Sequence, residues 1–480
     1  MKRISLAEIA DECSGALMVD DTTSDGTLEI SGVTHDSRSV AQGDLFVCIN
    51  GINHDGHSYA AEAVKGGATA LLVERQLNLA IPQIVVPDVR KAIGGTSAAV
   101  YGHPSKQMKV IGITGTAGKT TVAQATAQTL KACGASVGVI GTLEGSHTTP
   151  EAPEFQKMLS QMQSRGDEWV CAEVSSHGLE FGRVQGTEFA ASVFTNLSPE
   201  HLDFHDDMEQ YFLAKRRLFD QRSALAVISA VDEWGKRLAK ELQEIEHKDL
   251  VVVESKMIEN PTLNVEISSF IWRGQQIRTR LLGMFNLVNL LLVGETLKGL
   301  GLDEEMIASG LEKVEPVKGR MELVTAPRSE IAVIVDYSHK PEALAQALRT
   351  LRSVTSGRVW VVFGAGGDRD PKKRPLMGQI AAELADEIVV TSDNPRSEDP
   401  SDIAKEIVSG MDGESSNPKI LLERADAIQF AIGQATKGDS ILIAGKGHET
   451  YQIIGGEQRP FDDTKVAKEA LLARFGTPKP

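Results

Sequence analysis

The sequence of 480 residues predicts an α/β protein of three domains. Apolar, strand-like segments alternate with helical segments, which is the βαβ rhythm of a parallel sheet buried on both faces. A glycine-rich loop follows one of these strands and opens a helix. The chain is also too long for one ordinary hydrophobic core. We therefore expect domains at residues 1–107, 108–325 and 326–480.

Composition excludes several classes of protein. Asp and Glu total 66 against 50 Lys and Arg, so the net charge of −16 argues against a general binder of nucleic acids or anionic membranes. The most apolar run, 281–293, is short and contains Asn286 and Asn289, so it predicts no membrane span. No apolar signal sequence follows Met1, and the four cysteines show no CxxC spacing. We expect a cytoplasmic protein.

The first block contains strand-like segments at 45–49 and 70–73, with a helix-like segment at 58–65 between them. His103-Pro104-Ser105 then interrupts the pattern.

The loop Gly115-Thr116-Ala117-Gly118-Lys119-Thr120-Thr121 follows the apolar strand 110–113 and opens a helix that stops at Gly134. Glycines let backbone N–H groups turn toward an anion, and the helix N-terminus favours negative charge. Lys119 can reach terminal phosphates, and Thr120 can ligate Mg²⁺. Ile113 stands where the strict motif has its first glycine. A glycine-rich turn with a solvated lysine would leave Lys-Thr-Thr unexplained, so we predict nucleoside triphosphate binding.

Three further strands are expected at 137–140, 169–174 and 191–195. Glu173 ends the second of these, and His201 follows the third. Because parallel strands end at one sheet edge, both are candidates to join Thr120 around Mg²⁺, the carboxylate being the more usual ligand. Lys215 lies in an amphipathic helical segment, where spacing alone indicates a solvated lysine. A β region near 250–280 and a helix at 286–299 complete the block.

In the last block, polar clusters follow four predicted strands, at 331–335, 359–363, 387–391 and 440–444. Ligands of open α/β sheets bind at the carboxyl ends of strands, so one site is expected there. Arginines pair with carboxylates, while Asp and Asn bind ammonium groups, so a zwitterion such as an amino acid would suit it. A surface network of ion pairs is the alternative.

The residues at this point resemble those of the Mur ligases, the ATP-dependent amino-acid-adding enzymes of peptidoglycan synthesis. Within the family they are similar to the type that adds the third residue to UDP-MurNAc-L-Ala-D-Glu. The matching motifs are Asp36-Ser37-Arg38, Gly43–Phe46, Gly115–Thr121, Thr148-Thr149-Pro150, Glu173–His177, His201-Leu202-Asp203, Ala214-Lys215, Asn286 with Asn289, Gly319–Glu322, Asp336–His339, Gly367–Asp370, Asp393–Arg396 and Gly445–Glu449.

The resemblance implies an N-terminal domain for the UDP end of the substrate, a central ATPase domain with a small β addition, and a C-terminal Rossmann-like domain for the amino acid. It implies ATP and Mg²⁺ as cofactors and an acyl phosphate on the D-Glu carboxylate. It also implies that Lys215 reacts with CO₂ to form a carbamate, which would be an anionic metal ligand.

The implied site residues fall into five groups. The catalytic residues are Lys119, Glu173, His201 and Lys215, and the metal ligands are Thr120, Glu173, His201 and Lys215. The ATP-binding residues are Gly115, Thr116, Ala117, Gly118, Lys119, Thr120, Thr121, Asn286, Arg320, Asp336 and His339. The UDP-substrate residues are Ser37, Asn53, His54, Thr148, Thr149, Ser175 and Arg183. The amino-acid residues are Arg369, Asp393, Asn394, Pro395, Arg396, Gly445 and Glu449.

Asp-Asn-Pro-Arg is the family signature for meso-2,6-diaminopimelate, and Arg396 can pair with the distal carboxylate that L-lysine lacks. A lysine-adding or otherwise specialised Mur-type ligase is the runner-up, supported by the short segment 141–147 before Thr148. A nucleotide-binding switch would be expected to lose Lys119, Glu173 or Lys215, yet all three are present. A dinucleotide oxidoreductase lacks its glycine fingerprint here.

Overall fold

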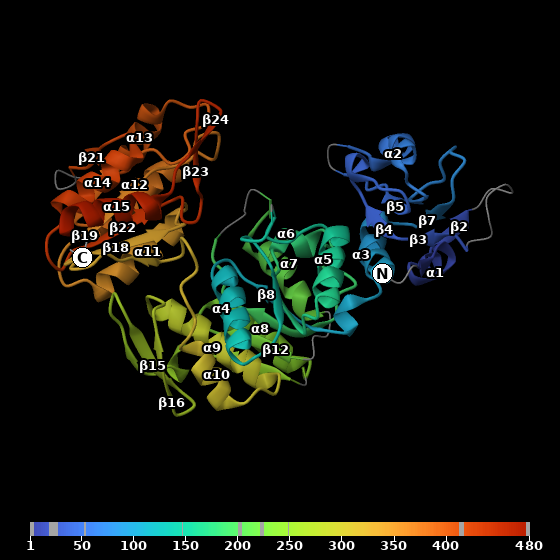
Figure 1. Cartoon of the computed structure of the whole chain (residues 1–480), viewed down its shortest axis with the longest axis horizontal. Helices are drawn as coiled ribbons and strands as arrows, with labels where there is room; N and C mark the ends of the chain where they lie inside the picture. The colour runs from blue at the N-terminus through green and yellow to red at the C-terminus, as the bar shows by residue number, and fades with distance from the viewer. Residues whose placement is uncertain are drawn as a thin grey trace. The chain divides into compact units, whose positions relative to one another are not determined.

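The computed structural model describes residues 4–18, 27–51, 54–145, 147–199, 204–220, 225–247, 249–411 and 417–476. The chain divides into two compact units, whose elements can be followed in Figure 1. The first unit contains Met1–Met257 and Val288–Leu311, and the second contains Ile258–Leu287 and Glu312–Pro480. The limits 1–107, 108–325 and 326–480 stay a prediction.

The N-terminal part of the first unit is built on a five-stranded sheet in the order β2-β7-β6-β5-β4. Strands β4 to β7 run parallel, and β2 is antiparallel to β7. The predicted strand 70–73 has the expected bounds, and 45–49 begins and ends slightly earlier. The elements are β1 Ile4–Ser5, α1 Leu6–Glu12, β2 Ala16–Met18, β3 Glu29–Ile30, β4 Gly32–Thr34, η1 Ser37–Ser39, β5 Asp44–Val47, η2 Gly56–Tyr59, α2 Ala60–Gly66, β6 Ala70–Val73, β7 Gln83–Val85, α3 Val89–Val100 and η3 Pro104–Lys106.

The rest of the first unit is built on a six-stranded parallel sheet in the order β13-β12-β11-β8-β10-β9. Side chains of α5 to α8 bury one face of it. The elements are β8 Lys109–Thr114, α4 Lys119–Ala132, β9 Val137–Ile140, α5 Ala152–Ser164, β10 Trp169–Glu173, α6 Ser176–Glu180, β11 Phe189–Phe194, α7 Met208–Asp220, β12 Leu225–Ser229, α8 Glu233–Glu244, β13 Leu250–Val253, η4 Ser255–Met257, α9 Met284–Gly299 (from Val288 onward) and α10 Glu304–Leu311.

The second unit contains a three-stranded antiparallel sheet, a β-hairpin and a six-stranded sheet in the order β17-β18-β22-β19-β20-β21. Only β17 is antiparallel in the larger sheet. Its elements are β14 Glu259–Thr262, β15 Ser268–Trp272, β16 Gln275–Thr279, β17 Glu322–Val324, β18 Ala332–Asp336, α11 Pro341–Val354, β19 Val359–Phe363, α12 Lys373–Leu384, β20 Glu387–Val390, α13 Pro400–Val408, β21 Lys419–Ile420, α14 Arg424–Gln434, β22 Ser440–Ala444, β23 Tyr451–Ile454, β24 Glu457–Pro460 and α15 Asp463–Phe475.

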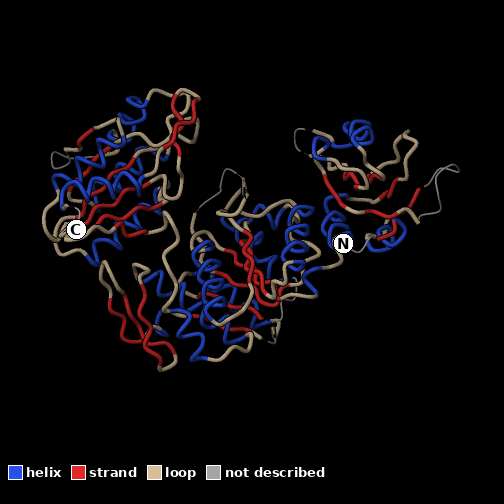
Figure 2. Tube along the Cα trace, in the orientation of Figure 1, coloured by secondary structure: helices blue, strands red, loops and turns tan. Residues whose placement is uncertain are grey.

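Helices cover both faces of this larger sheet, as Figure 2 shows by colour. Helices α11, α12 and α13 pack on one face, and α14 and α15 pack on the other. Alternate residues of β19 enter the two cores, since successive side chains of a strand point to opposite faces. The predicted α/β class with parallel sheets is confirmed. The β region expected near 250–280 consists of β13, which joins the parallel sheet, and the separate antiparallel strands β14 to β16.

None of the helices in the described part of the chain has the length and apolar character needed to cross a bilayer.

Candidate active site

The glycine-rich loop joins the carboxyl end of β8 to the N-terminus of α4. Gly115 has a φ of +149°, and a Cβ there would lie 1.9 Å from Thr195 Oγ1, so only glycine fits. The end of β11 holds the loop from the side. The backbone N–H of Ala117 donates to Asn196 Oδ1 at 2.9 Å, and the Thr195 hydroxyl donates to the Ala117 carbonyl at 2.6 Å. These contacts fix the predicted phosphate loop against the residues that follow β11.

Lys119 is the first residue of α4, and its ammonium group lies against the loop. It donates to the carbonyl oxygens of Gly115 and Thr116, both at 2.8 Å. Thr121 lies in the same first helical turn. The predicted phosphate-binding residues 115–121 thus form one continuous strand–loop–helix unit.

Thr120 and Glu173 meet at the carboxyl edge of the parallel sheet. The Thr120 hydroxyl donates to Glu173 Oε2 at 2.9 Å, and the Thr142 backbone N–H donates to Oε1 at 3.0 Å. Both Thr120 and Glu173 are buried. A hydroxyl and a carboxylate are hard oxygen donors of the kind Mg²⁺ prefers. His201 lies outside the described residues, among which no three His, Cys, Asp or Glu side chains form a metal-binding cluster.

Lys215 is buried rather than solvated, so the interpretation from its spacing alone was wrong. Its side chain is 1% exposed, and its ammonium group donates to the Gly115 carbonyl at 2.9 Å. It also lies 4.6 Å from the ring centroid of Tyr211, one helical turn away. Lys215 therefore sits on the inner face of α7, directly beside the phosphate loop.

Four residues predicted for the UDP-substrate gather beside Glu173. The Thr149 hydroxyl donates to the Glu173 carbonyl at 3.0 Å and accepts the Ser175 backbone N–H at 2.9 Å. Arg183 donates to the Thr149 carbonyl at 2.9 Å. The hydroxyl of Thr148 lies 3.0 Å from that of Thr142.

The two other described residues of that group lie in the N-terminal part. The Ser37 hydroxyl donates to Glu62 Oε2 at 3.4 Å, and exposed His54 has its ring centroid 6.4 Å from that of Tyr59. Asn53 lies outside the described residues.

In the second unit, three of the residues predicted to bind ATP, Arg320, Asp336 and His339, lie at the end of β18. Asp336 accepts the Met321 backbone N–H at 2.7 Å and the Ser338 hydroxyl, while the Arg320 guanidinium lies 4.6 Å from the Tyr337 ring centroid. Burial raises the pKa of Asp336 and lowers the pKa of His339 to about 4. Asn286 lies in α9 and donates to the Leu282 carbonyl at 2.8 Å.

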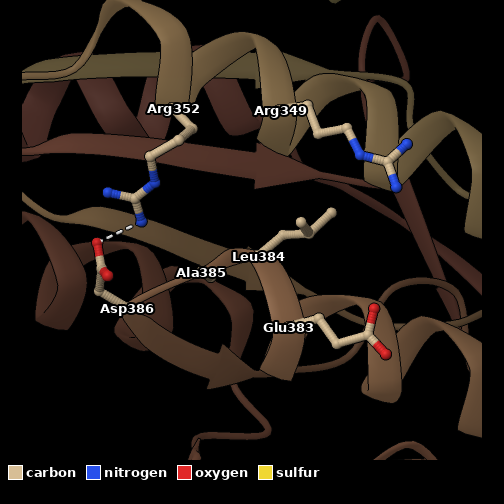
Figure 3. A pocket seen from close by; sticks show the side chains of 6 residues that line it. All are labelled: Arg349, Arg352, Glu383, Leu384, Ala385 and Asp386. Carbon is tan, nitrogen blue, oxygen red and sulfur yellow. Dashed lines mark hydrogen bonds and ion pairs between the residues drawn. The ribbon is translucent and has the colours of Figure 1, made fainter.

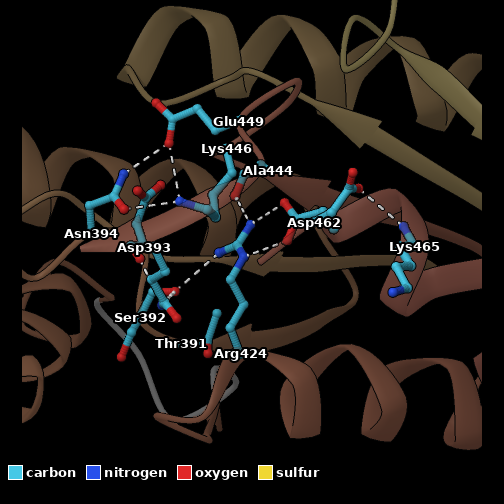
Figure 4. A network of polar contacts seen from close by, with 12 residues as sticks. Thr391, Ser392, Asp393, Asn394, Arg424, Ala444, Lys446, Glu449, Asp462 and Lys465 are labelled. Carbon is cyan, nitrogen blue, oxygen red and sulfur yellow. Dashed lines mark hydrogen bonds and ion pairs between the residues drawn. The ribbon is translucent and has the colours of Figure 1, made fainter. Parts of the chain in front are cut away.

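The loops that follow β20 and β22 are joined by a network of polar contacts (Figure 4). The Asn394 amide donates to Glu449 Oε2 at 2.9 Å, and Lys446 donates to both side chains. Arg424 donates to the Ser392 and Ala444 carbonyls at 3.3 and 3.0 Å, which ties the two strand ends together. Burial raises the pKa of Asp393, against the opposing charges of Arg424 and Lys446.

Arg396 and Arg369 lie on the neighbouring loops. The Arg396 guanidinium donates to the Gly367 carbonyl at 2.6 Å, and its backbone N–H donates to the Ile453 carbonyl at 3.0 Å. Pro395 is buried beside it, whereas Arg369 is exposed. The four predicted polar clusters therefore share one edge of the sheet.

A separate cavity of about 370 Å³ lies elsewhere in the second unit (Figure 3). Asp386 lines it and precedes β20, whereas Asp393 and Asn394 follow that strand, so the cavity is at the opposite edge of the sheet. It contains the exposed ion pair Arg352–Asp386, at 2.5 Å. Its lining residues are Arg349, Arg352, Glu383, Leu384, Ala385 and Asp386.

Three family models match the chain in order. They are the Mur ligase family, catalytic domain, over residues 29–129; the Mur ligase middle domain, over 113–296; and the Mur ligase, glutamate ligase domain, over 319–447. A protein of Geobacillus kaustophilus named UDP-N-acetylmuramoyl-L-alanyl-D-glutamate–2,6-diaminopimelate ligase is 39% identical, covering 94% of this chain and 96% of its own. The chain belongs to the Mur ligase family.

Other similar proteins support the assignment of this chain to the Mur ligase family. A protein of the same name from Gloeobacter violaceus is 43% identical, with 95% of this chain and 96% of its own covered. A solved structure of such a ligase has a TM-score of 0.73 at 31% identity, covering 99% of this chain and all of its own. The ADP complex of MurF from Thermotoga maritima, at 19% identity, shares the fold with a TM-score of 0.61 over 92% of this chain and 96% of its own.

Several residues that lie against the predicted site were not assigned a role from the sequence. Asn196 and Thr142 were not singled out because a loop amide and a loop threonine carry no chemical pattern. Arg424 opens a helix far along the chain and gave no signal. Lys446 stands within a motif that was recognised, but it was assigned no role.

Proposed function

We propose that this chain is an ATP-dependent ligase that joins meso-2,6-diaminopimelate to the D-Glu carboxylate of UDP-MurNAc-L-Ala-D-Glu, in peptidoglycan precursor synthesis. The observation that carries the proposal is the gathering of Lys119, Thr120 and Glu173 at the carboxyl edge of one parallel sheet. The full-length relatives bear the name of this activity. ATP use is supported by the phosphate loop and by the ADP complex of a protein with the same fold.

The reaction has two steps in this proposal. An oxygen of the D-Glu carboxylate attacks the γ-phosphorus of ATP, and ADP leaves, so that an acyl phosphate forms. The amine of the amino acid then attacks the acyl carbon, loses a proton, and phosphate leaves as the amide forms. Lys119 and the N-terminus of α4 stabilise the charge on the transferring phosphoryl group.

Mg²⁺ is the second cofactor of the proposal, held by Thr120, Glu173, His201 and a carbamate on Lys215. The adjacent oxygens of Thr120 and Glu173 support this assignment. The buried position of Lys215 beside the loop supports its role as a metal ligand after modification. An ammonium group cannot ligate a metal ion, whereas a carbamate can. When bound, Mg²⁺ would neutralise phosphate charge. A carbamate signal with ¹³C-labelled CO₂ in the wild type, absent in Lys215→Arg, tests the modification.

The amino acid would bind in the second unit, where the predicted pocket residues lie. Arg396 would pair with the distal carboxylate of diaminopimelate, a group that L-lysine lacks. A guanidinium facing lysine would be left unpaired beside another cation, which costs roughly 2–5 kcal/mol. A cytoplasmic location, where ATP is available, completes the proposal.

The test is nucleotide-dependent phosphate release with UDP-MurNAc-L-Ala-D-Glu and one of three acceptors: meso-diaminopimelate, L-lysine or L-ornithine. We expect release with diaminopimelate and little with the other two. Equal rates with L-lysine would favour the lysine-adding alternative. No release with any acceptor, or undiminished release without the UDP-substrate, would contradict the proposed function.

A further inference from the structure

The side-chain amide of Asn394 has only one orientation available. Its oxygen accepts hydrogen bonds from the Lys446 ammonium at 3.0 Å and from the Ile453 backbone N–H at 2.9 Å. Both partners are donors, so the oxygen must face them, and two hydrogen bonds use both of its lone pairs. The amide nitrogen points to Glu449 Oε2, at 2.9 Å. Asn394 can therefore offer a ligand an N–H group but no acceptor.

Lys446 closes this triangle from a fully buried position. Its side chain is 0% exposed, and its ammonium group donates to Glu449 Oε2 at 3.1 Å as well as to Asn394. Figure 4 shows the ammonium group between the two side chains. Taking an ammonium group out of water is costly unless its contacts compensate. Here its hydrogen-bond acceptors are one carboxylate and one amide oxygen, both from predicted pocket residues, and the Tyr451 ring centroid lies 5.7 Å away.

The other buried cation of the network, Arg424, forms its ion pair with a different carboxylate. Arg424 pairs with Asp463 through two contacts of 2.7 Å, and both side chains are fully buried. Among the described residues, Lys446 is then the cation that pairs with Glu449, near a second buried carboxyl, that of Asp393. Lys446 is thus placed to keep two acidic groups close together.

We propose that Lys446 is a positioning residue of the amino-acid pocket. Its ammonium group orients Asn394 and Glu449, so that a ligand carboxylate meets the N–H of Asn394 and a ligand ammonium group meets the remaining oxygen of Glu449. Lys446 itself does not touch the ligand. The inference rests on the proposed function, in which the ligand is a diamino dicarboxylic acid. It adds Lys446 as the residue that determines where the ligand's carboxylate and ammonium groups bind.

Kinetics of three variants test this role. Lys446→Met removes the ammonium group, Lys446→Arg keeps a buried cationic donor, and Lys437→Met is the matched control on an exposed lysine. Phosphate release is measured against diaminopimelate concentration at saturating ATP and UDP-substrate. For Lys446→Met we expect the KM for diaminopimelate to rise roughly tenfold or more, with kcat and the KM for ATP changed less than about threefold. Lys446→Arg should recover part of the loss.

Two kinetic outcomes would overturn the inference. One is an unchanged KM for diaminopimelate in Lys446→Met. The other is a parallel change of kcat and every KM, which would indicate only a structural role.

A crystallographic comparison separates this inference from the proposed function. In Lys446→Met crystals soaked with meso-diaminopimelate we expect the Glu449 carboxylate to leave Asn394. An unchanged Asn394–Glu449 contact would refute the positioning role even if the wild type formed no amide. If the wild-type protein released no phosphate, the proposed function would be refuted. The crystallographic comparison would still decide whether Lys446 positions Asn394 and Glu449.

Discussion

Two short contacts at Glu173 link the phosphate loop to the acceptor side of the site. One carboxylate oxygen accepts the Thr120 hydroxyl, and the other accepts a backbone N–H from the segment before Thr148. The residue also ends β10, so its position is set by the sheet. A single carboxylate thus joins the start of α4 to the segment that contains Thr142.

Glu173→Gln should leave the fold intact and remove most activity. The neutral amide can still accept the Thr120 hydroxyl, but it lacks the negative charge through which Glu173 would bind the proposed Mg²⁺ ion. We expect kcat to fall by roughly a hundredfold or more. Exposed Glu168→Gln, just before the same strand, is the matched control. If Glu173→Gln kept the wild-type rate of phosphate release at limiting Mg²⁺, Glu173 could not be a ligand of the metal ion.

Arg396→Ala should reduce the preference for diaminopimelate over L-lysine. Under the proposed function, loss of the guanidinium would remove the partner of the distal carboxylate and also the unpaired charge that would disfavour lysine, a change of roughly 2–5 kcal/mol in discrimination. The ratio of kcat/KM values for the two amino acids measures it. Arg352→Ala, at the opposite edge of the same sheet, is the control and should keep the wild-type ratio.

At the scale of elements, the strands were the most predictable part of the chain. The segments 137–140, 359–363 and 440–444 have the predicted bounds because each is a mostly apolar run that follows a polar residue and stops before a glycine. Polar clusters after the four predicted strands of the last block, 331–335, 359–363, 387–391 and 440–444, correctly located one shared edge of that sheet. Short edge strands such as β17 and β21 have little apolar signal and were not predicted.

The burial of Lys215 shows what element-level patterns miss. Its place on the inner face of α7 follows the helical register of Tyr211 and Leu218, yet a lysine in an amphipathic segment is ordinarily solvated. Spacing cannot tell which face of the helix packs inward when both carry mixed residues. Motif resemblance, rather than periodicity, pointed to a special role.

The loop before β17 approaches the loop after β22 closely, at Gly319. A Cβ at Gly319 would lie 2.1 Å from the Gly447 carbonyl carbon, and its φ is +67°. Gly456 has a similar φ of +81° but open space around it. We expect Gly456→Ala to cost about 1 kcal/mol and Gly319→Ala a further 1–3 kcal/mol or so from overpacking. Thermal unfolding of both variants measures the difference, and equal losses would contradict the close approach.

The end of β18 should make stability depend on pH through His339. Burial lowers its pKa to about 4, and nearby Lys340, Lys373 and Arg320 act in the same direction. An unfolded chain binds this proton more tightly, near pH 6.5 or so. The stability contributed by neutral His339 is therefore full above about pH 6.5 and is lost as the pH falls toward 4.

His339→Asn, which keeps a side-chain donor for the Tyr337 carbonyl, should flatten this pH dependence. Between pH 6.5 and 4.5 we expect the variant to lose about 2 kcal/mol less than the wild type. Unfolding curves at several pH values measure it. His103→Asn is the control, because asparagine tolerates its φ of +50°. Identical pH slopes for wild type and His339→Asn would rule out the effect.

At the scale of the whole molecule, the chain carries a net charge of −16 while its proposed ligands are anions. In the proposed function, anion binding must therefore depend on local groups: the N-terminus of α4 and Lys119 for phosphates, and Arg396 for a carboxylate. Electrostatic attraction by the molecule as a whole cannot supply it.

ATP with Mg²⁺ should raise the thermal stability of the intact chain through this local site. At a ligand concentration about 100 times Kd, binding contributes about 2.7 kcal/mol. Lys119→Ala should largely remove the shift in Tm, while Lys131→Ala, an exposed lysine at the end of the same helix, should keep it. A full shift in Lys119→Ala would place the nucleotide elsewhere.

The hold of Lys119 on its own loop has a consequence for turnover. Before a nucleotide binds, the Lys119 ammonium group already donates to the carbonyls of residues 115 and 116. Nucleotide binding therefore replaces these hydrogen bonds with contacts to phosphate and does not have to order a flexible loop. The net gain on binding is smaller, and the same carbonyls are ready to recapture the ammonium group once the terminal phosphate has been transferred. We therefore expect ADP to dissociate rapidly, so that product inhibition between turnovers is weak.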